Sequence, residues 1–324
     1  MIEEILPSLF KIEIPLPNNP LKSLNAYLIK GNDRFLLIDT GMNRKECLQE
    51  MTSSLEKLNI DLTKTDLFIT HLHADHLGLA AILATSTSKV YFNRIESSYI
   101  NQLERWQEAH NYYLANGFPE NELKKSMERH PGYQYGLREK VRFNIVNEGD
   151  VIEIGDYRFS CIETPGHSPG HMCLYEAKQN ILVSGDHILF DITPNITYWP
   201  GVDNSLKKYI ESLNKIYNFE VKLVLPGHRR IWNNHRDRIV ELKRHHETRV
   251  NEVLSTLKYG GKNAFEIAPH ITWDVDCDSW EEFPPTQKWF AFGETIAHLE
   301  YLEENRIVRR SAKNNKITFS LVKY

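Results

Sequence analysis

The stretch THLHADHLG, residues 70–78, crowds metal-binding side chains into six consecutive positions. They are His71, His73, Asp75 and His76. Imidazole nitrogens and carboxylate oxygens both suit Zn²⁺ and neighbouring divalent ions, so this crowding indicates a metal site. The apolar run just before it, Leu67 to Thr70, predicts a buried strand whose carboxyl end delivers His71 into a loop.

Three later turns, each close to an apolar run, carry more side chains of the same kind. TPGHSPGH (164–171) contains His167 and His171, SGDH (184–187) contains Asp186 and His187, and LPGH (225–228) contains His228. Three separate strand ends therefore present His or Asp. We expect His171 and His187 to support ligands or to be structural. The histidines without such a pattern are expected on the surface or in the core, namely His110, His130, His235, His245, His246, His270 and His298.

Composition is that of an ordinary globular protein. The chain has 324 residues, 41% of them hydrophobic and 25% charged, enough for one large domain and a small one. Its net charge of −4 offers no general attraction to nucleic acid or to an anionic membrane. The first residues, MIEEILPSLF, lack a signal-peptide pattern and no run is long enough to span a membrane, so we expect a cytoplasmic protein. The four widely spaced cysteines are expected to be buried free thiols.

Short apolar runs predict strands at 9–17, 25–31 and 34–41, and strand patterns return after residue 140. Residues 94–138 differ, because they have helical spacing with a Gly-Phe-Pro break, and we interpret them as a helical insert. An insert between two ligand motifs is a natural wall or lid for a pocket. Its aromatic side chains, and Tyr198 and Trp199 in a later loop, are nevertheless expected mainly to pack.

The set HLHADH, TPGH, SGD and LPGH, preceded by LLIDTG (36–41), resembles the metallo-beta-lactamase superfamily. The TPGHSPGH form is similar to its glyoxalase II-like branch. The resemblance covers about residues 8–240. It implies an α/β fold, a four-layered αββα sandwich, with metals at one edge of its two sheets.

Residue by residue, the resemblance implies two divalent metal ions, most readily Zn²⁺, with Fe²⁺ or Mn²⁺ as alternatives. The implied ligands of the first ion are His71, His73 and His167. Those of the second are Asp75, His76 and His228, with Asp186 as the bridging carboxylate. Asp39 in LLIDTG matches an aspartate that supports the ligand cluster.

Seven ligands shared by two ions leave each ion an open position, which is typical of catalytic sites. A bridging water would then lose a proton near neutral pH, and the hydroxide would attack a polarised carbonyl. Asp75, expected to be both ligand and catalytic residue, would orient that hydroxide. We therefore predict a dinuclear metallo-hydrolase acting on a small carboxylic ester, thioester or lactone. We expect neither β-lactamase activity nor true glyoxalase II identity, since neither a secretion signal nor a glutathione-binding C-terminal region can be matched.

Residues 241–324 are predicted to form a different unit. Their pattern indicates the order helix, turn, helix, acidic loop, helix and hairpin. The third helix places Ile296, Leu299 and Leu302 on one face, and IVRR and ITFSLV flank the turn SAKNNK (311–316). This outline resembles the winged-helix tail of some metallo-beta-lactamase-like hydrolases. It implies a winged-helix-like domain after a catalytic domain at 1–240. Because such hydrolases include RNA endonucleases, single-strand endoribonuclease activity is the alternative function.

Charge disfavours the nucleic-acid alternative. Residues 245–324 contain ten Lys or Arg and twelve Asp or Glu. The expected recognition helix carries four glutamates that would repel phosphate, at Glu294, Glu300, Glu303 and Glu304. Basic residues at the wing keep a weak RNA contact open, namely Arg306, Arg309, Arg310, Lys313 and Lys316. We therefore expect a small-molecule substrate, and a tail used for packing or homodimerisation.

Overall fold

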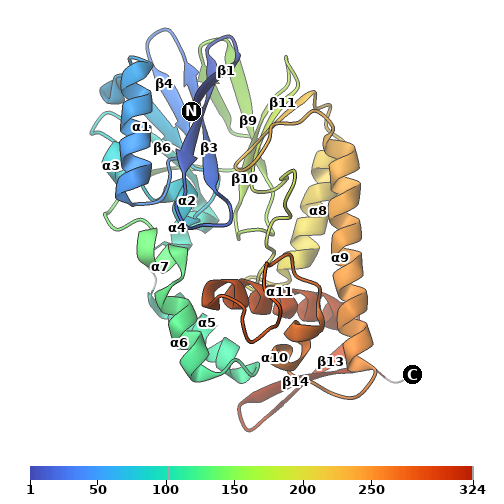
Figure 1. Cartoon of the computed structure of the whole chain (residues 1–324). Helices are drawn as coiled ribbons and strands as arrows, with labels where there is room; N and C mark the ends of the chain where they lie inside the picture. Colours follow the sequence, from blue (N-terminus) through green and yellow to red (C-terminus); the bar gives the residue numbers. More distant parts are fainter. Residues whose placement is uncertain (101–102, 323–324) are drawn as a thin grey trace.

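Two β-sheets packed face to face form the centre of the structure, with helices on both outer faces (Figure 1). It is a computed structural model that describes residues 1–100 and 103–322. Two sheets with a helical layer outside each make four layers. The predicted α/β fold class, an αββα sandwich, is therefore confirmed.

The larger sheet contains seven strands in sequence order. They are β1 (Ile2–Leu6), β2 (Leu9–Pro15), β3 (Ser23–Lys30), β4 (Phe35–Ile38), β5 (Thr65–Phe68), β6 (Val90–Asn93) and β7 (Phe143–Val146). Strands β1 to β4 pair antiparallel, whereas β4 to β7 pair parallel. The segments that follow β4 and β5 therefore leave the sheet at the same edge.

The smaller sheet has five strands in the order β12-β11-β10-β9-β8. They are β8 (Val151–Ile154), β9 (Tyr157–Glu163), β10 (Met172–Glu176), β11 (Ile181–Gly185) and β12 (Leu223–Pro226). Strands β11 and β12 pair parallel, so the segments after them also share one edge. In open sheets this is where ligands commonly bind.

Three apolar clusters hold the layers together. Between the sheets, large side chains such as Tyr27, Phe68 and Phe159 are buried completely or almost so. The outer face of the larger sheet is covered by α1 (Lys45–Lys57), α2 (Ala74–Leu77) and α3 (Ala80–Leu83), with the short η1 (Leu62–Lys64) nearby. The smaller sheet is covered by α8 (Ser205–Tyr217) and the first part of α9 (His235–Leu257).

The strand that leads into the histidine-rich stretch ends earlier than predicted. We expected strand structure from Leu67 to Thr70, whereas β5 ends at Phe68. The Asp39 carboxylate accepts hydrogen bonds from the Thr70 backbone amide and hydroxyl, both at 2.9 Å. Because a side chain takes the Thr70 N–H, the sheet ladder stops and the chain leaves the sheet before His71.

In the described part of the segment between β6 and β7, where the insert is predicted, the chain forms four helices. They are α4 (Arg94–Tyr99), α5 (Leu103–Ala115), α6 (Glu120–Glu128) and α7 (Pro131–Tyr135). The break between α5 and α6 includes the Gly-Phe-Pro sequence at 117–119, with Gly117 at a φ of 97°. Its positive φ suits glycine, so the residue types that marked the break also make it.

After α9 the chain forms α10 (Ala264–Ile267), η2 (Ala268–His270), α11 (Pro285–Glu304), β13 (Val308–Lys313) and β14 (Lys316–Leu321). The hairpin turn is tighter than the predicted SAKNNK, because Asn314 and Asn315 alone make it, with φ of 51° and 58°. Two such residues suit a type I′ turn. Residue 240 lies inside α9, so that helix crosses the predicted domain boundary. The separate winged-helix-like domain stays a prediction.

The insert and the C-terminal helices share one apolar core. Tyr113, Phe118 and Leu123 of the insert pack in the same cluster as Trp289 and Phe292 of α11. The rings of Tyr113 and Trp289 have centroids 4.5 Å apart. Figure 1 shows α5 and α6 beside α10 and α11, below the two sheets. Two segments far apart in sequence are therefore packed as one unit.

The two longest helices, α9 and α11, have 23 and 20 residues. That length would cross a bilayer, but both helices carry many charged side chains. Within residues 1–100 and 103–322, no helix combines the length and the apolar character that a membrane span needs. All four cysteines are free, and Cys277 is half-buried rather than buried as predicted.

A substitution at Gly293 in α11 would test how tightly the insert and the C-terminal helices are packed. A Cβ atom there would collide with the Thr197 hydroxyl and the Tyr113 hydroxyl. In an open helix Gly→Ala adds about 1 kcal/mol of stability. Here we expect Gly293→Ala to lower the free energy of unfolding by about 1–3 kcal/mol, because both hydroxyls must move. Urea denaturation measures this.

The control is Gly261→Ala, where the nearest atoms to an added Cβ lie 3.5 Å away or more. That variant should keep the stability of the unmodified protein. A Gly293→Ala protein that is as stable as the control would contradict the close packing.

Candidate metal centre

All seven predicted ligands converge at one edge of the two sheets. They arrive on the segment after β5, on the loop between β9 and β10, and on the segments after β11 and β12. They are His71, His73, Asp75, His76, His167, Asp186 and His228. All are buried except His73, which is half-buried. Four parts of the sequence thus meet in one small volume.

The first group consists of three imidazoles. His73 Nδ1 lies 2.9 Å from His71 Nε2 and 3.0 Å from His167 Nε2. The three rings meet nearly edge to face, with interplanar angles of 76° to 88°. Three nitrogens directed at one point match the three protein ligands of a four-coordinate catalytic zinc site.

The second group combines a carboxylate with two imidazoles. Asp75 Oδ2 lies 3.2 Å from His228 Nε2 and 3.9 Å from His76 Nε2. Asp75 and His76 lie in α2, and His73 is the residue before its first turn. One short helix therefore sends His73 to the first group and Asp75 and His76 to the second.

Asp186 lies between the two groups. Its Oδ2 is 3.6 Å from His167 Nε2 and 3.5 Å from His228 Nε2, and its Oδ1 is 3.5 Å from His76 Nε2. This carboxylate therefore faces members of both groups at once, which is the position that a bridging ligand needs.

Hydrogen bonds on the far side of the rings fix which nitrogen faces the centre. The Nδ1 atoms of His76, His167 and His228 each donate to an oxygen. The acceptors, in that order, are the Asp39 carboxylate (2.7 Å), the Asn195 carbonyl (2.8 Å) and the Ser23 carbonyl (2.7 Å). Each Nε2 is thereby left with a lone pair for a metal.

The donor set fits divalent cations. His76 Nε2, His228 Nε2 and Asp186 Oδ1 are buried and have no hydrogen-bond partner. A buried polar atom without a partner costs about 1–3 kcal/mol. A cation between the two groups would give each of these atoms a partner.

Charge leads to the same conclusion. Burial raises the pKa of Asp75, but His76 and His228 outweigh it and lower that pKa to about 2. Burial lowers the pKa of His228, but Asp186 and Asp75 raise it to about 10. Burial and neighbouring imidazoles keep the pKa of His71 well below its ordinary value. The buried carboxylates are thus ionised and require positive charge beside them. Without a metal ion, protons on the His76 and His228 rings supply that charge, and bound cations would replace those protons and leave each Nε2 as a ligand.

Glu96 is a site residue that sequence reasoning missed. It is completely buried in α4, and its carboxylate accepts hydrogen bonds from the Leu72 amide (2.7 Å), the Ser168 hydroxyl (2.6 Å) and the Gly170 amide (2.6 Å). One side chain of the insert therefore ties the loop of His71 and His73 to the loop of His167. A single glutamate in a helix gives no local signal of such a role.

His171 and His187 lie beside the two groups but belong to neither. His171 Nε2 accepts a hydrogen bond from the Asp186 backbone amide at 3.1 Å, and its Nδ1 bonds the Thr164 hydroxyl at 2.8 Å. His187 packs edge to face against Tyr209, with ring centroids 5.4 Å apart. His171 thus supports Asp186, and His187 packs in the core.

A further cluster had no sequence pattern. His245 and His246 of α9 and Glu294 of α11 present ligand-type atoms within 4.8 Å of one another. Neither histidine has a ligand pattern in the sequence, because Glu294 comes from a different helix. Arg249 pairs with Glu294 at the same place.

Trp199 lies closer to the metal ligands than predicted. Its ring stacks beside that of His73, with centroids 5.8 Å apart and an interplanar angle of 25°. Its indole N–H donates to the His167 carbonyl at 3.2 Å. Tyr198 instead stacks on Tyr112 at 4.3 Å, which is the loop packing that we expected for both. Trp199 is therefore a wall of the candidate site.

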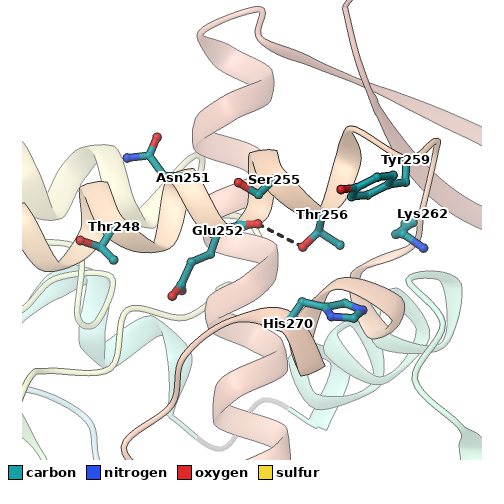
Figure 2. Close-up of a pocket in the computed structure, with 8 residues that line it drawn as sticks. All are labelled: Thr248, Asn251, Glu252, Ser255, Thr256, Tyr259, Lys262 and His270. Atoms are coloured by element: carbon teal, nitrogen blue, oxygen red, sulfur yellow. Dashed lines mark hydrogen bonds between the residues drawn. The ribbon is translucent and has the colours of Figure 1, made fainter.

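A separate hollow of about 620 Å³ lies along α9 (Figure 2). Figure 2 shows its lining side chains, all of which come from α9 or the segment 259–270. They are Thr248, Asn251, Glu252, Ser255, Thr256, Tyr259, Lys262 and His270. The hollow shares no residue with the two ligand groups, so the candidate reaction site is at the sheet edge.

The sequence profile of the metallo-beta-lactamase superfamily matches residues 20–228, which include all seven ligands. The chain belongs to the metallo-beta-lactamase superfamily. This membership makes the protein a metallo-hydrolase by family, and its His and Asp groups fit the divalent metals that the superfamily binds.

Two relatives and one solved structure are similar to this chain. The probable metallo-hydrolase YqjP of Bacillus subtilis is 24% identical and covers 96% of this chain and 97% of its own. The acyl-coenzyme A thioesterase MBLAC2 of Homo sapiens is 26% identical over 63% of this chain and 72% of its own. The metallo-beta-lactamase family protein TTHA1429 of Thermus thermophilus is similar in structure, with a TM-score of 0.83 and 27% identity over 98% of this chain and all of its own. That similarity includes the C-terminal helices.

Glu96 predicts a pH dependence of stability. Burial raises its pKa to about 7, although three hydrogen bonds oppose the shift, against about 4.3 in an unfolded chain. The stabilising contribution of the protonated form is therefore complete below about pH 4.3 and lost as pH rises through 7. We expect the stability of the unmodified protein, relative to Glu96→Gln, to fall by about 2 kcal/mol between pH 5 and pH 8. Urea denaturation across that range, at constant metal content, measures it.

The control is Glu104→Gln, which replaces an exposed glutamate of α5. Its stability should follow that of the unmodified protein at every pH. If the Glu96→Gln difference is also constant with pH, Glu96 does not titrate in this range.

Proposed function

We propose that this chain is a dinuclear metallo-hydrolase that cleaves a small carboxylic ester, thioester or lactone. The observation that carries the proposal is the position of Asp186, which faces members of two ligand groups at 3.5 to 3.6 Å. One ion would be held by His71, His73 and His167, and the other by Asp75, His76 and His228.

Two such ions, most readily Zn²⁺, would supply a nucleophilic hydroxide near neutral pH and stabilise negative charge on the attacked carbonyl oxygen. The orientation of the nucleophile would depend on a side chain of this protein. His76 and His228 lower the pKa of Asp75 to about 2 in the metal-free site, and cations bound by these two rings would keep Asp75 ionised in the same way. Asp75 would then orient the nucleophile as a hydrogen-bond acceptor. In hydrolysis of a thioester, the new carbon–oxygen bond replaces the carbon–sulfur bond, and the products are a carboxylic acid and a thiol.

The surroundings of the centre favour a small substrate. Trp199 stacks beside His73, and Tyr99 of α4 packs edge to face on Trp199 with ring centroids 5.9 Å apart. The Arg105 guanidinium lies 3.8 Å from the Tyr99 ring centroid, and both side chains bond the Pro200 carbonyl. Trp199 and Tyr99, the latter from the insert, therefore place aromatic rings along one side of the site, as in small-molecule pockets.

Thioesters are the first subclass to test. The motif TPGHSPGH is similar to that of the glyoxalase II-like branch, and a relative at 26% identity is named as an acyl-coenzyme A thioesterase. Neither comparison identifies the acyl group of the substrate. The proposal therefore names only the type of bond that is cleaved.

Single-strand endoribonuclease activity is the second candidate, favoured by the hairpin of β13 and β14. Arg309, Lys313 and Lys316 are exposed on it. Arg310 is engaged by Glu303 at 2.7 Å and lies 3.7 Å from Glu300, which weakens its attraction for phosphate. The hairpin thus offers three exposed cations and one that is already paired.

The test measures metal content and turnover together. We expect the purified protein to hold two divalent ions and to hydrolyse short acyl thioesters or lactones while leaving single-stranded RNA intact. His73→Ala should lose at least one ion and reduce turnover by about 100-fold or more, because a ligand of the first ion is gone. Elemental analysis and thiol release measure the two quantities.

His270→Ala is the matched control, since it removes an exposed histidine outside the centre. It should keep both metal and turnover. Full activity without bound metal would refute the proposal, and RNA cleavage that is lost in His73→Ala would establish the second candidate instead.

A further inference from the structure

The loop that carries Asn195 connects a metal ligand to the C-terminal helices. The Asn195 carbonyl accepts the hydrogen bond from His167 Nδ1 at 2.8 Å, and this bond directs His167 Nε2 toward His73. The position of that carbonyl therefore sets the orientation of one ligand ring. An outer partner of this kind commonly changes metal affinity by 10–100-fold.

Asn195 is in turn held by α11. Its side-chain amide donates to Glu294 Oε2 at 2.7 Å and to the Phe290 carbonyl at 3.4 Å. Three residues further on, the Tyr198 amide donates to the Gly293 carbonyl at 3.1 Å. The loop is therefore bonded to one short stretch of α11 at two points.

Glu294 is itself fixed by a buried ion pair with Arg249 of α9, and only 2% of Glu294 is exposed. Arg249 also donates to the Thr272 carbonyl at 3.3 Å, and its guanidinium lies 4.4 Å from the Trp273 ring centroid. Removing one partner of a buried pair is strongly destabilising, because it leaves the other charge buried without compensation. The pair is thus a rigid point of attachment for Asn195.

The same carboxylate belongs to the cluster with His245 and His246, whose Nε2 atoms have no hydrogen-bond partner. Metal binding there is the competing interpretation. However, the two oxygens of Glu294 are already used by Arg249 and Asn195. A guanidinium in contact with the carboxylate would also repel a cation, so the charges favour an anchor for the loop.

We infer that Glu294 and Arg249 are positioning residues that act on His167 through Asn195, so that the C-terminal helices set the affinity of the first metal. The inference rests on the proposed function in one respect, namely that the group of His71, His73 and His167 binds an ion.

The test is the affinity for Zn²⁺, measured by competition with a chromophoric chelator. In Asn195→Ala we expect one of the two Zn²⁺ ions to bind about 10-fold more weakly or worse, while the other keeps its affinity. Asn195→Asp should bind that ion at least as weakly as Asn195→Ala, since the new carboxylate would repel the carboxylate of Glu294. Glu294→Gln should weaken the binding of the same ion, because it removes the carboxylate that holds both Asn195 and Arg249.

The control is Glu122→Gln, which breaks the ion pair between Glu122 and Lys288 of the same helix α11 (2.8 Å) without touching Asn195. It should leave both Zn²⁺ affinities unchanged. A general loosening of α11 would instead weaken binding in the control as well, and that result would overturn the inference.

Other outcomes separate the alternatives. Unchanged affinities in Asn195→Ala would overturn the inference while the proposed function stood. Loss of a third Zn²⁺ equivalent in Glu294→Gln would establish a metal site at His245 and His246 and overturn the anchor. An unmodified protein that binds no metal would refute the proposed function itself.

Discussion

The Asp39 carboxylate is the contact on which the candidate site depends. It receives the Thr70 amide and hydroxyl on one side and the His76 ring on the other, all within hydrogen-bond distance and away from water. The first contact ends β5 and turns the chain out of the sheet. The second fixes the tautomer of a ligand. Asp39 itself has a φ of 61°, an uncommon backbone conformation that the surrounding packing must hold in place.

The convergence of the candidate ligands could be predicted because their pattern is local in the sequence. In HLHADH four candidate ligands lie within six positions, and the other three each follow a turn signal after an apolar run. Such a pattern requires no knowledge of distant contacts. The layered architecture was also accessible, because the strand patterns and the resemblance agreed. The predicted end of β5 was wrong by two residues, since the side chain of Asp39, the residue after β4, accepts from the Thr70 amide that the sheet would have used.

The residues that hold the ligands in place could not be predicted in the same way. Glu96 bonds two loops that are far apart in sequence, and Asn195 and Glu294 lie nearly a hundred residues from each other. Each is an ordinary polar residue in its own segment. Their roles arise only from tertiary contacts, so periodicity and spacing contain no trace of them. For the same reason the sequence does not show that α9 continues across residue 240, from the smaller sheet to the shared C-terminal core.

That shared core limits how this protein can evolve. Tyr113 and Phe118 of the insert and Phe292 of α11 interlock, while α11 also bonds the loop beside the metal ligands. Because the C-terminal segment shares this core, recombination could not replace it with another segment and leave the packing intact. A relative that acquired a different insert would need a compensating change in α11, so the two segments are expected to diversify as a pair. New substrate ranges would then arise by joint drift of both segments rather than by the gain or loss of a domain.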